Sequence, residues 1–222
     1  MKGKTTVRKD TPRYLLLVEG KDDKHVFYSL LEYYKIPDLF KIEDNEGVER
    51  LLEIFEVVLI LPETERLGIV VDADTNLEAR WQQITNILKN AGYNTIPPNP
   101  SGEGTILQEE GRPRIGIWLM PNNKIPGMLE DFVSFLRPPD DVLWPIVEDA
   151  IQRVRAIDEE LRFRNVYESK ARIHTWLAWQ REPGKPMGQA ISARYLDADA
   201  PYAQELISWL RKLFDLEALS LK

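Results

Sequence analysis

Two kinds of hydrophobic pattern alternate through the N-terminal part of the chain. Short apolar runs without polar alternation predict strands that are buried on both faces of a parallel sheet. Longer segments with apolar positions at helical spacing follow these runs and predict amphipathic helices. The predicted strands are residues 13–18, 40–43, 67–71 and 115–120, and the predicted helices are residues 22–34, 46–61, 77–91 and 128–136.

The pattern changes at Pro138 and Pro139. Beyond them we expect only helices, at residues 141–161, 167–180 and 201–214, with a loop at residues 181–188. Strands that alternate with helices imply right-handed crossovers and a mainly parallel sheet. The sequence therefore predicts an α/β fold: a mainly parallel four-stranded sheet flanked by helices in residues 12–136, with a C-terminal helical extension, residues 137–222, packed on it as one structural unit.

Three further segments carry weaker patterns. Residues 1–12 are interpreted as a flexible basic arm, and residues 97–104 form a loop by their Pro and Gly content. Thr95 and Ile96 are candidates for a short edge segment, whereas residues 105–113 fit no element clearly.

Composition narrows the class of protein. The chain has 222 residues and no cysteine, which excludes disulfides and thiolate metal sites and fits a reducing cytoplasm. The apolar run after the basic N-terminus is too short for a signal peptide or a membrane span, so we expect a cytoplasmic protein without a membrane partner. The net charge of -7 argues against a molecule that is basic overall and binds nucleic acid by charge alone.

Carboxylates follow two of the predicted strands at the point where each strand ends. Glu19 comes after the first strand, and Asp72 and Asp74 come after the strand at residues 67–71. Ligands of open parallel sheets bind just beyond the carboxyl ends of the strands. If the two strands are neighbours, the three carboxylates lie together and repel one another, and a divalent cation relieves that repulsion. Oxygen ligands favour a hard ion, Mg2+ or Mn2+.

This arrangement resembles the TOPRIM domain, the catalytic core shared by topoisomerases, bacterial primases and the OLD family of nucleases. The resemblance rests on Glu19-Gly20 after a buried strand, on Asp22 and Asp23 shortly afterwards, and on the Asp72-x-Asp74 pair after a later strand. The stretch V-E-G-K-D-D is most similar to OLD-like and small stand-alone TOPRIM-related proteins of uncharacterised function.

The resemblance implies a role for each matching residue. Glu19 resembles the glutamate that binds metal or acts as general acid and base, and Asp72 and Asp74 resemble the paired aspartates that hold Mg2+. Asp22 or Asp23 resembles an extra acid found in nucleases that use two metal ions. Lys170 resembles, by position only, a lysine that stabilises charge in the transition state; alternatively it lies on a solvated helix face that it shares with His174.

Structural roles compete with these functional ones. Asp22 and Asp23 occupy the first turn of a predicted helix, where acids are favoured by the helix dipole. Asp72 and Asp74 are alternatively caps of the next helix, through a turn containing Thr75 and Asn76. Glu130 either completes a second metal site or, with Asp131, is a first-turn acid. Lys21 and Lys124, in turns at the same sheet edge, either bind phosphate or neutralise the acids.

Two functions follow as hypotheses. The first is a Mg2+-dependent phosphodiester-processing enzyme, a nuclease of TOPRIM type, with DNA or RNA as substrate and a protein partner recruited by the helical extension. The second is a non-catalytic TOPRIM-like module that binds metal or a phosphorylated ligand in a regulatory role. The sequence leaves open the type of nucleic acid, the number of metal ions and the oligomeric state.

Overall fold

The computed structural model describes residues 13–216, so the predicted basic arm lies outside the described residues. A single mixed sheet of five strands lies at its centre, in the order β2-β1-β3-β5-β4. All neighbouring pairs are parallel except β4 with β5. The strands are β1 (Tyr14–Val18), β2 (Lys41–Asp44), β3 (Arg66–Asp72), β4 (Thr105–Leu107) and β5 (Arg114–Met120).

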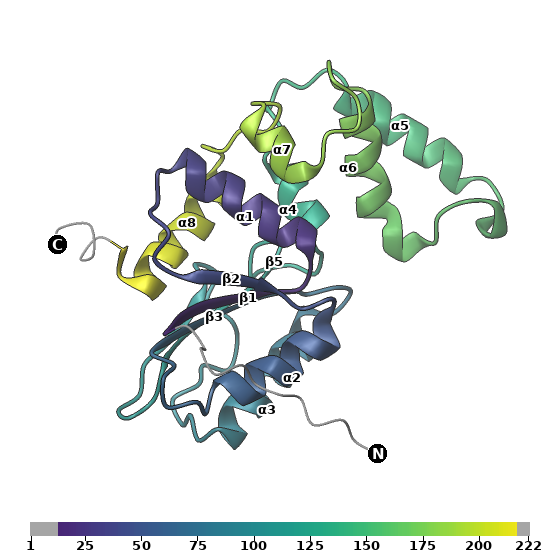
Figure 1. Cartoon of the computed structure of the whole chain (residues 1–222). Coiled ribbons are helices and arrows are strands. Elements are labelled where there is room, and N and C mark those ends of the chain that lie inside the picture. The colour runs from purple at the N-terminus through teal and green to yellow at the C-terminus, as the bar shows by residue number, and fades with distance from the viewer. Residues whose placement is uncertain (1–12, 217–222) are drawn as a thin grey trace.

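Helices cover both faces of the sheet and extend beyond it (Figure 1). Helices α2 and α3 lie on one face, and α1, α7 and α8 lie on the other. The helices are α1 (Lys21–Tyr33), α2 (Val48–Val58), α3 (Leu77–Asn90), α4 (Leu129–Phe135), α5 (Trp144–Arg155), α6 (Glu168–Ala178), α7 (Met187–Ser192) and α8 (Pro201–Phe214), with short 3-10 turns at Glu159–Leu161 and Asn165–Tyr167. No helix in residues 13–216 is long and apolar enough to cross a membrane.

The strands are buried on both faces, as their continuous apolar runs predict. In β1, Leu16 and Val18 belong to the core that includes α1 and α8, whereas Leu15 and Leu17 belong to the core that includes α2 and α3. Successive side chains of a strand point to opposite faces, so both faces need apolar residues.

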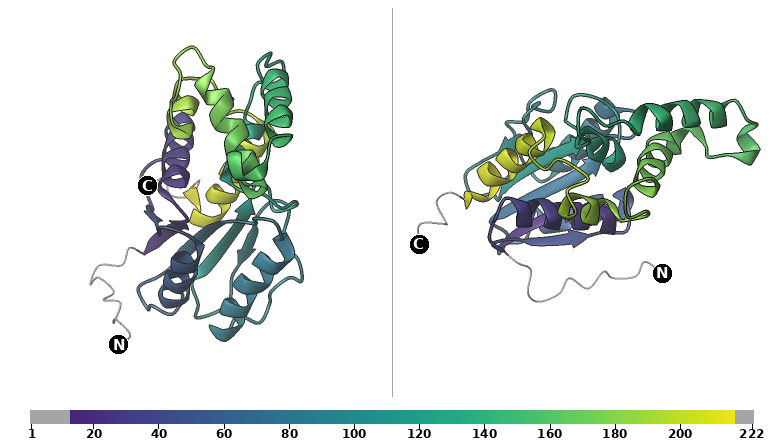
Figure 2. Two further views of the ribbon diagram at one scale, coloured as in Figure 1. Left: turned by 90° about the vertical axis from the view of Figure 1, so that its right-hand side faces the viewer. Right: turned by 90° about the horizontal axis from the view of Figure 1, so that it is seen from above.

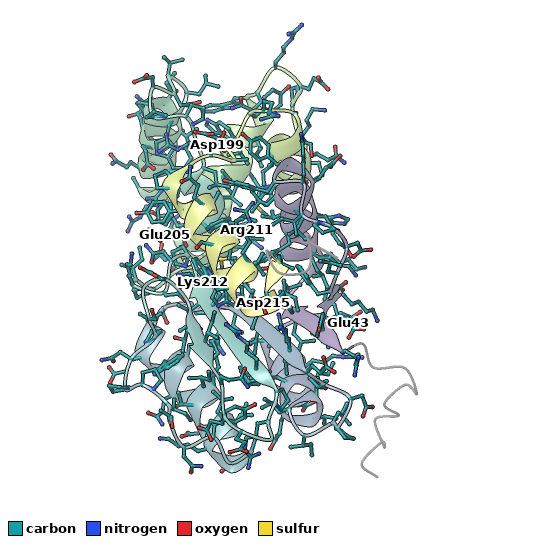
Figure 3. All side chains as sticks on the ribbon, turned by 90° about the vertical axis from the view of Figure 1, so that its left-hand side faces the viewer. Glu43, Asp199, Glu205, Arg211, Lys212 and Asp215 are labelled. Atoms are coloured by element: carbon teal, nitrogen blue, oxygen red, sulfur yellow. The ribbon has the colours of Figure 1, made fainter. Side chains whose placement is uncertain are left out.

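Helix α8 of the C-terminal extension packs directly on the sheet. Gly68 of β3 and Gly116 of β5 are paired in register beneath it. A Cβ atom at Gly116 would lie 2.5 Å from Cδ2 of Leu213, so this approach requires a residue without a side chain. The other side of α8 is charged: Glu205, Arg211 and Lys212 are labelled along it in Figure 3, and Lys212 lies 3.1 Å from Glu103.

Helices α5 and α6 form an arm that projects from the rest of the molecule (Figure 2). The start of α6 contacts the start of α4 at the carboxyl edge of the sheet, where the Ser169 hydroxyl donates to Oδ1 of Asp131 at 2.5 Å. The arm therefore brings a distant part of the chain to the sheet edge at which the carboxylates lie.

The structure corrects the sequence-based prediction in several places. The sheet has a fifth strand, β4, in the segment that fitted no element, and Thr95 and Ile96 form no strand. Only three residues of β4 pair, too few to show an alternating pattern. The predicted helix at residues 141–161 ends at Arg155 and is followed by a 3-10 turn.

The predicted loop at residues 181–188 runs into a helix that the sequence did not reveal, α7. A Cβ atom at Gly188 would lie 2.7 Å from the carbonyl oxygen of His25, so α7 lies against α1 with almost no space between them. This six-residue helix is stabilised by tertiary contact, because isolated helices of that length are marginal in water.

Candidate metal centre

The carboxyl ends of β1, β3 and β5 meet at one edge of the sheet and bring the predicted carboxylates together. Val18 at the end of β1 is in register with Val70 of β3, and Asp72 of β3 is in register with Met120 of β5. Glu19 follows β1 directly, and the turn after β5 leads to Glu130 in the first turn of α4. The neighbouring positions of β1 and β3, on which the sequence-based expectation depended, are therefore observed.

Glu19 and Asp72 are linked through the backbone. The Asp72 N–H donates to Oε1 of Glu19 at 2.8 Å, and the Leu129 N–H donates to Oδ1 of Asp72 at 2.9 Å. Within residues 13–216, the second oxygen of neither carboxylate takes part in a hydrogen bond or ion pair. Each carboxylate is thus held by one oxygen and has the other available for a ligand.

Burial and mutual repulsion raise the pKa of both carboxyl groups. For Asp72 burial has the largest effect, followed by the charges of Glu19, Asp23, Glu130 and Asp74, and its pKa lies well above the ordinary value. The pKa of Glu19 is also raised, again chiefly by burial, although the Asp72 N–H and the charge of Arg80 oppose the shift. Ionising all the carboxyl groups at this edge of the sheet therefore costs free energy in the folded protein.

Asp74 is turned toward a cation of the chain. Its carboxylate oxygen Oδ2 lies 2.5 Å from Nη2 of Arg80, and its backbone N–H donates to the Gly127 carbonyl at 2.9 Å. Its φ of 51° is left-handed, a conformation that aspartate tolerates better than most residues. Neither Asp72 nor Asp74 caps the following helix, because the N-cap of α3 is Asn76, whose side chain accepts from the Ala79 N–H.

Of the two acids after Glu19, only Asp23 is buried. It is 7% exposed, and its Oδ2 accepts from the Gly20 N–H at 3.1 Å, which confirms the capping role considered for one of the pair. Burial, followed by the charge of Glu19, raises its pKa to about 7. Asp22 is exposed on the first turn of α1.

Glu130 and Lys170 form an ion pair beside the carboxylates. Nζ of Lys170 lies 2.9 Å from Oε1 of Glu130, whose side chain is only 6% exposed. The hydrogen bond that Lys170 donates to Glu130 is the main reason that the pKa of Lys170 is raised, and the charges of Asp22 and Asp72 add to the shift. The positive charge of Lys170 thus interacts with the carboxylates of the site. Asp131, the first-turn acid beside Glu130, accepts from the Met128 N–H and from Ser169.

Within residues 13–216, no hydrogen bond or ion pair joins Lys21, Lys124 or His174 to the carboxylates. Lys21 is exposed at the first position of α1, where its charge acts on Asp44. Lys124 lies against α8, with its Nζ 3.8 Å from Oε2 of Glu205. His174 is exposed on α6.

Two residues at the site escaped the sequence-based prediction. Arg80 and Ser169 both contact aspartates there, but neither type of residue marks a site by itself. The available signal for Arg80 was its place in the first turns of the helix that follows the Asp72-x-Asp74 pair, from which a long side chain can reach back over the turn.

The donor set fits a hard divalent ion held in part by the protein. Within residues 13–216, no group of three or more histidine, aspartate or glutamate side chains could hold a metal ion. Mg2+ is commonly bound by one or two carboxylates, with water and substrate phosphate as its other ligands. Glu19 and Asp72, each with a free oxygen, suit that mode and do not form an all-protein cage.

Asp23 gives the metal-free protein a specific pH dependence. Since its pKa is raised from 3.8 to about 7, its contribution to stability is full below pH 4 and is lost as the pH rises to about 7. In chelator, we expect the free energy of unfolding to fall by about 2–3 kcal/mol between pH 5 and pH 8 through this group. Urea unfolding at both pH values checks this: Asp23→Asn, which can still accept from Gly20, should reduce the fall in the free energy of unfolding by about that amount, and exposed Asp38→Asn should not.

The fold and the site together define an α/β protein with a cluster of carboxylates at the carboxyl edge of a mainly parallel sheet. The chain belongs to the family described as "Protein of unknown function (DUF3226)", whose model matches residues 13–215. No curated protein sequence matches it significantly.

Two solved structures align with nearly the whole chain at low sequence identity. One is the C-terminal region of the OLD protein of Xanthomonas campestris pv. campestris, with 13% identity over 95% of this chain and 98% of that chain and a TM-score of 0.45. Another is a hypothetical protein from Pyrococcus horikoshii OT3, with 15% identity over 94% of this chain and 98% of that chain and a TM-score of 0.39.

Proposed function

We propose that the protein is a Mg2+- or Mn2+-dependent phosphodiester-processing enzyme, a nuclease of TOPRIM type. The observation that carries this proposal is the pair of Glu19 and Asp72 at adjacent strand ends, each held by a backbone N–H and each with one oxygen left free. Purely structural carboxylates at a buried strand end are normally paired with a cation, and these two form no ion pair within residues 13–216.

Glu19 and Asp72 are the residues that would hold the ion. When bound, the ion supplies Lewis acidity toward the phosphate and an activated water. In hydrolysis the water oxygen forms a bond to phosphorus while the bond to the leaving sugar oxygen breaks, and the leaving oxygen takes up a proton from solvent. Glu19, whose pKa is raised chiefly by burial, is suited to accept the proton from the water.

Lys170 is suited to stabilise the charge that develops on the phosphate. Its ammonium is held beside the carboxylates by buried Glu130, while about half of its side chain stays exposed and can reach a substrate. An ammonium group can donate three hydrogen bonds, so its bond to Glu130 leaves others for a phosphate oxygen.

Cleavage of nucleic acid tests the proposal. Single-stranded and double-stranded DNA and RNA should each be incubated with the protein in Mn2+, in Mg2+ and in chelator. Cleavage of at least one substrate that depends on the metal is the expected result. Stabilisation by metal without cleavage of any of the four substrates would contradict the enzyme and support the binding module.

Replacing Lys170 separates its role from that of the carboxylates. Lys170→Met should lower kcat by about 100- to 1,000-fold, because a charge placed at the developing oxyanion is lost. Binding of Mn2+ should persist, since Lys170 is not expected to touch the ion. Lys185→Met is the matched control, because Lys185 pairs with Glu182 in a different segment. Equal activity of Lys170→Met and the wild type would remove Lys170 from the reaction.

One observation favours the non-catalytic module as a second candidate. Two of the acids at the edge, Asp74 and Glu130, are already paired with cations of the chain, which leaves fewer ligands for a second metal ion. A module that binds a metal ion, and a phosphorylated ligand through that ion, needs only Glu19 and Asp72. The cleavage experiment above distinguishes the two candidates.

A further inference from the structure

Arg80 wraps the turn that carries the two aspartates. From α3 its Nε donates to the Asp72 carbonyl at 2.9 Å, its Nη2 lies 2.5 Å from Oδ2 of Asp74, and its Nη1 donates to Gln83 at 2.8 Å. The side chain is 11% exposed, so the guanidinium is largely shielded from water. Three of its nitrogens are thereby fixed, which makes Arg80 a built-in part of the site rather than a mobile surface charge.

Cations of the chain balance some, but not all, of the acids at the carboxyl edge of the sheet. Glu19, Asp23, Asp72, Asp74 and Glu130 form one cluster of acids that interact electrostatically. Arg80 is paired with Asp74, and Lys170 is paired with Glu130. Three acids of this cluster form no ion pair within residues 13–216. Asp23 is held in the first turn of α1 by the Gly20 N–H, whereas Glu19 and Asp72 lie at the strand ends, where a single divalent ion balances their combined charge.

Asp74 follows Asp72 by two residues in the same turn, which makes it a candidate ligand for a second ion beside the first. The guanidinium of Arg80 already forms an ion pair with the Asp74 carboxylate, and its positive charge would repel a metal ion nearby. We propose that Arg80 is a resident cation that takes the place of a second metal ion, so that the chain binds one divalent ion, through Glu19 and Asp72. This inference rests on the metal site of the proposed function and specifies its stoichiometry.

The number of bound Mn2+ ions per chain tests the inference without any assay of activity. Equilibrium dialysis at saturating Mn2+, with the free ion measured by electron paramagnetic resonance, should give about one ion for the wild type. Arg80→Lys keeps the charge and should also bind one. Arg80→Gln removes the charge and frees Asp74, and should bind two. The double variant R80Q/D74N should return to one.

The outcomes separate this inference from the proposed function. Two ions bound by the wild type, or one ion bound by a folded Arg80→Gln variant, would overturn the role of Arg80 and leave the metal site standing. No Mn2+ bound by the wild type would overturn the proposed site and this inference with it. The wild-type count requires no substitution, so it remains decisive even if the Arg80 variants fail to fold.

Discussion

Asp72→Asn is expected to lower metal-dependent phosphodiester cleavage by more than about 100-fold. Loss of a group that only orients a metal ligand typically costs 10- to 100-fold, and Asp72 is proposed to be a ligand itself. The fold should be retained, because the asparagine side-chain oxygen can still accept from the Leu129 N–H that now binds Oδ1. Rates of cleavage of the best substrate, measured for both proteins in Mn2+, check this expectation.

The same substitution should raise the stability of the metal-free protein at neutral pH. The pKa of Asp72 is raised well above its ordinary value, so its charged form is disfavoured in the folded state and becomes costly as the pH rises. A neutral side chain removes that cost. Asp38→Asn, at an exposed position, is the control for loss of a charge. Lost cleavage together with a lower midpoint of thermal unfolding would point to damage of the fold and not to a lost ligand.

Trp209→Ala should lower the free energy of unfolding by about 3–5 kcal/mol, the usual range for removal of a large buried aromatic side chain. Trp209 lies on α8, is fully buried and has its ring centre 5.6 Å from that of Trp118 in β5. For a chain of this length the loss corresponds to a fall of about 6–20 °C in the unfolding midpoint. Differential scanning calorimetry measures both quantities.

This variant also tests whether the extension and the sheet form one unit. If they do, Trp209→Ala shifts a single cooperative transition. Trp179→Ala is the matched control, because Trp179 is 41% exposed and should change stability little. A variant that melts in two steps, with the later step at the wild-type midpoint, would show that the sheet folds independently of α8.

The sheet and its carboxylate edge were predictable because their signals are local. Apolar runs at β1, β3 and β5 are long enough to be recognised, and acids that follow such runs must lie at the carboxyl edge. Strand β4 and helix α7 were missed because each is short and depends on its neighbours, β5 and α1.

The direction of side chains within the site was not predictable. Asp74 pairs with Arg80 because the arginine side chain extends back from α3 to the turn. The spacing of residues in the sequence does not reveal this contact. Likewise, the position of Lys170 beside Glu130 depends on how the arm of α5 and α6 returns to the sheet edge. Contacts between segments far apart in the sequence decide both cases.

Thermal unfolding in the presence of Mn2+ tests the central claim most directly, namely that Glu19 and Asp72 bind a divalent ion. Wild type and Asp72→Asn should be compared in chelator, in Mn2+, and in Mn2+ with a non-cleavable dinucleotide phosphorothioate. Ligand at 100 times its Kd stabilises the native state by about 2.7 kcal/mol, or about 5–10 °C here. We expect this rise for the wild type, with Mn2+ alone or with the dinucleotide, and none for Asp72→Asn. An equal rise in both proteins, or no rise in the wild type under either condition, would contradict the claim.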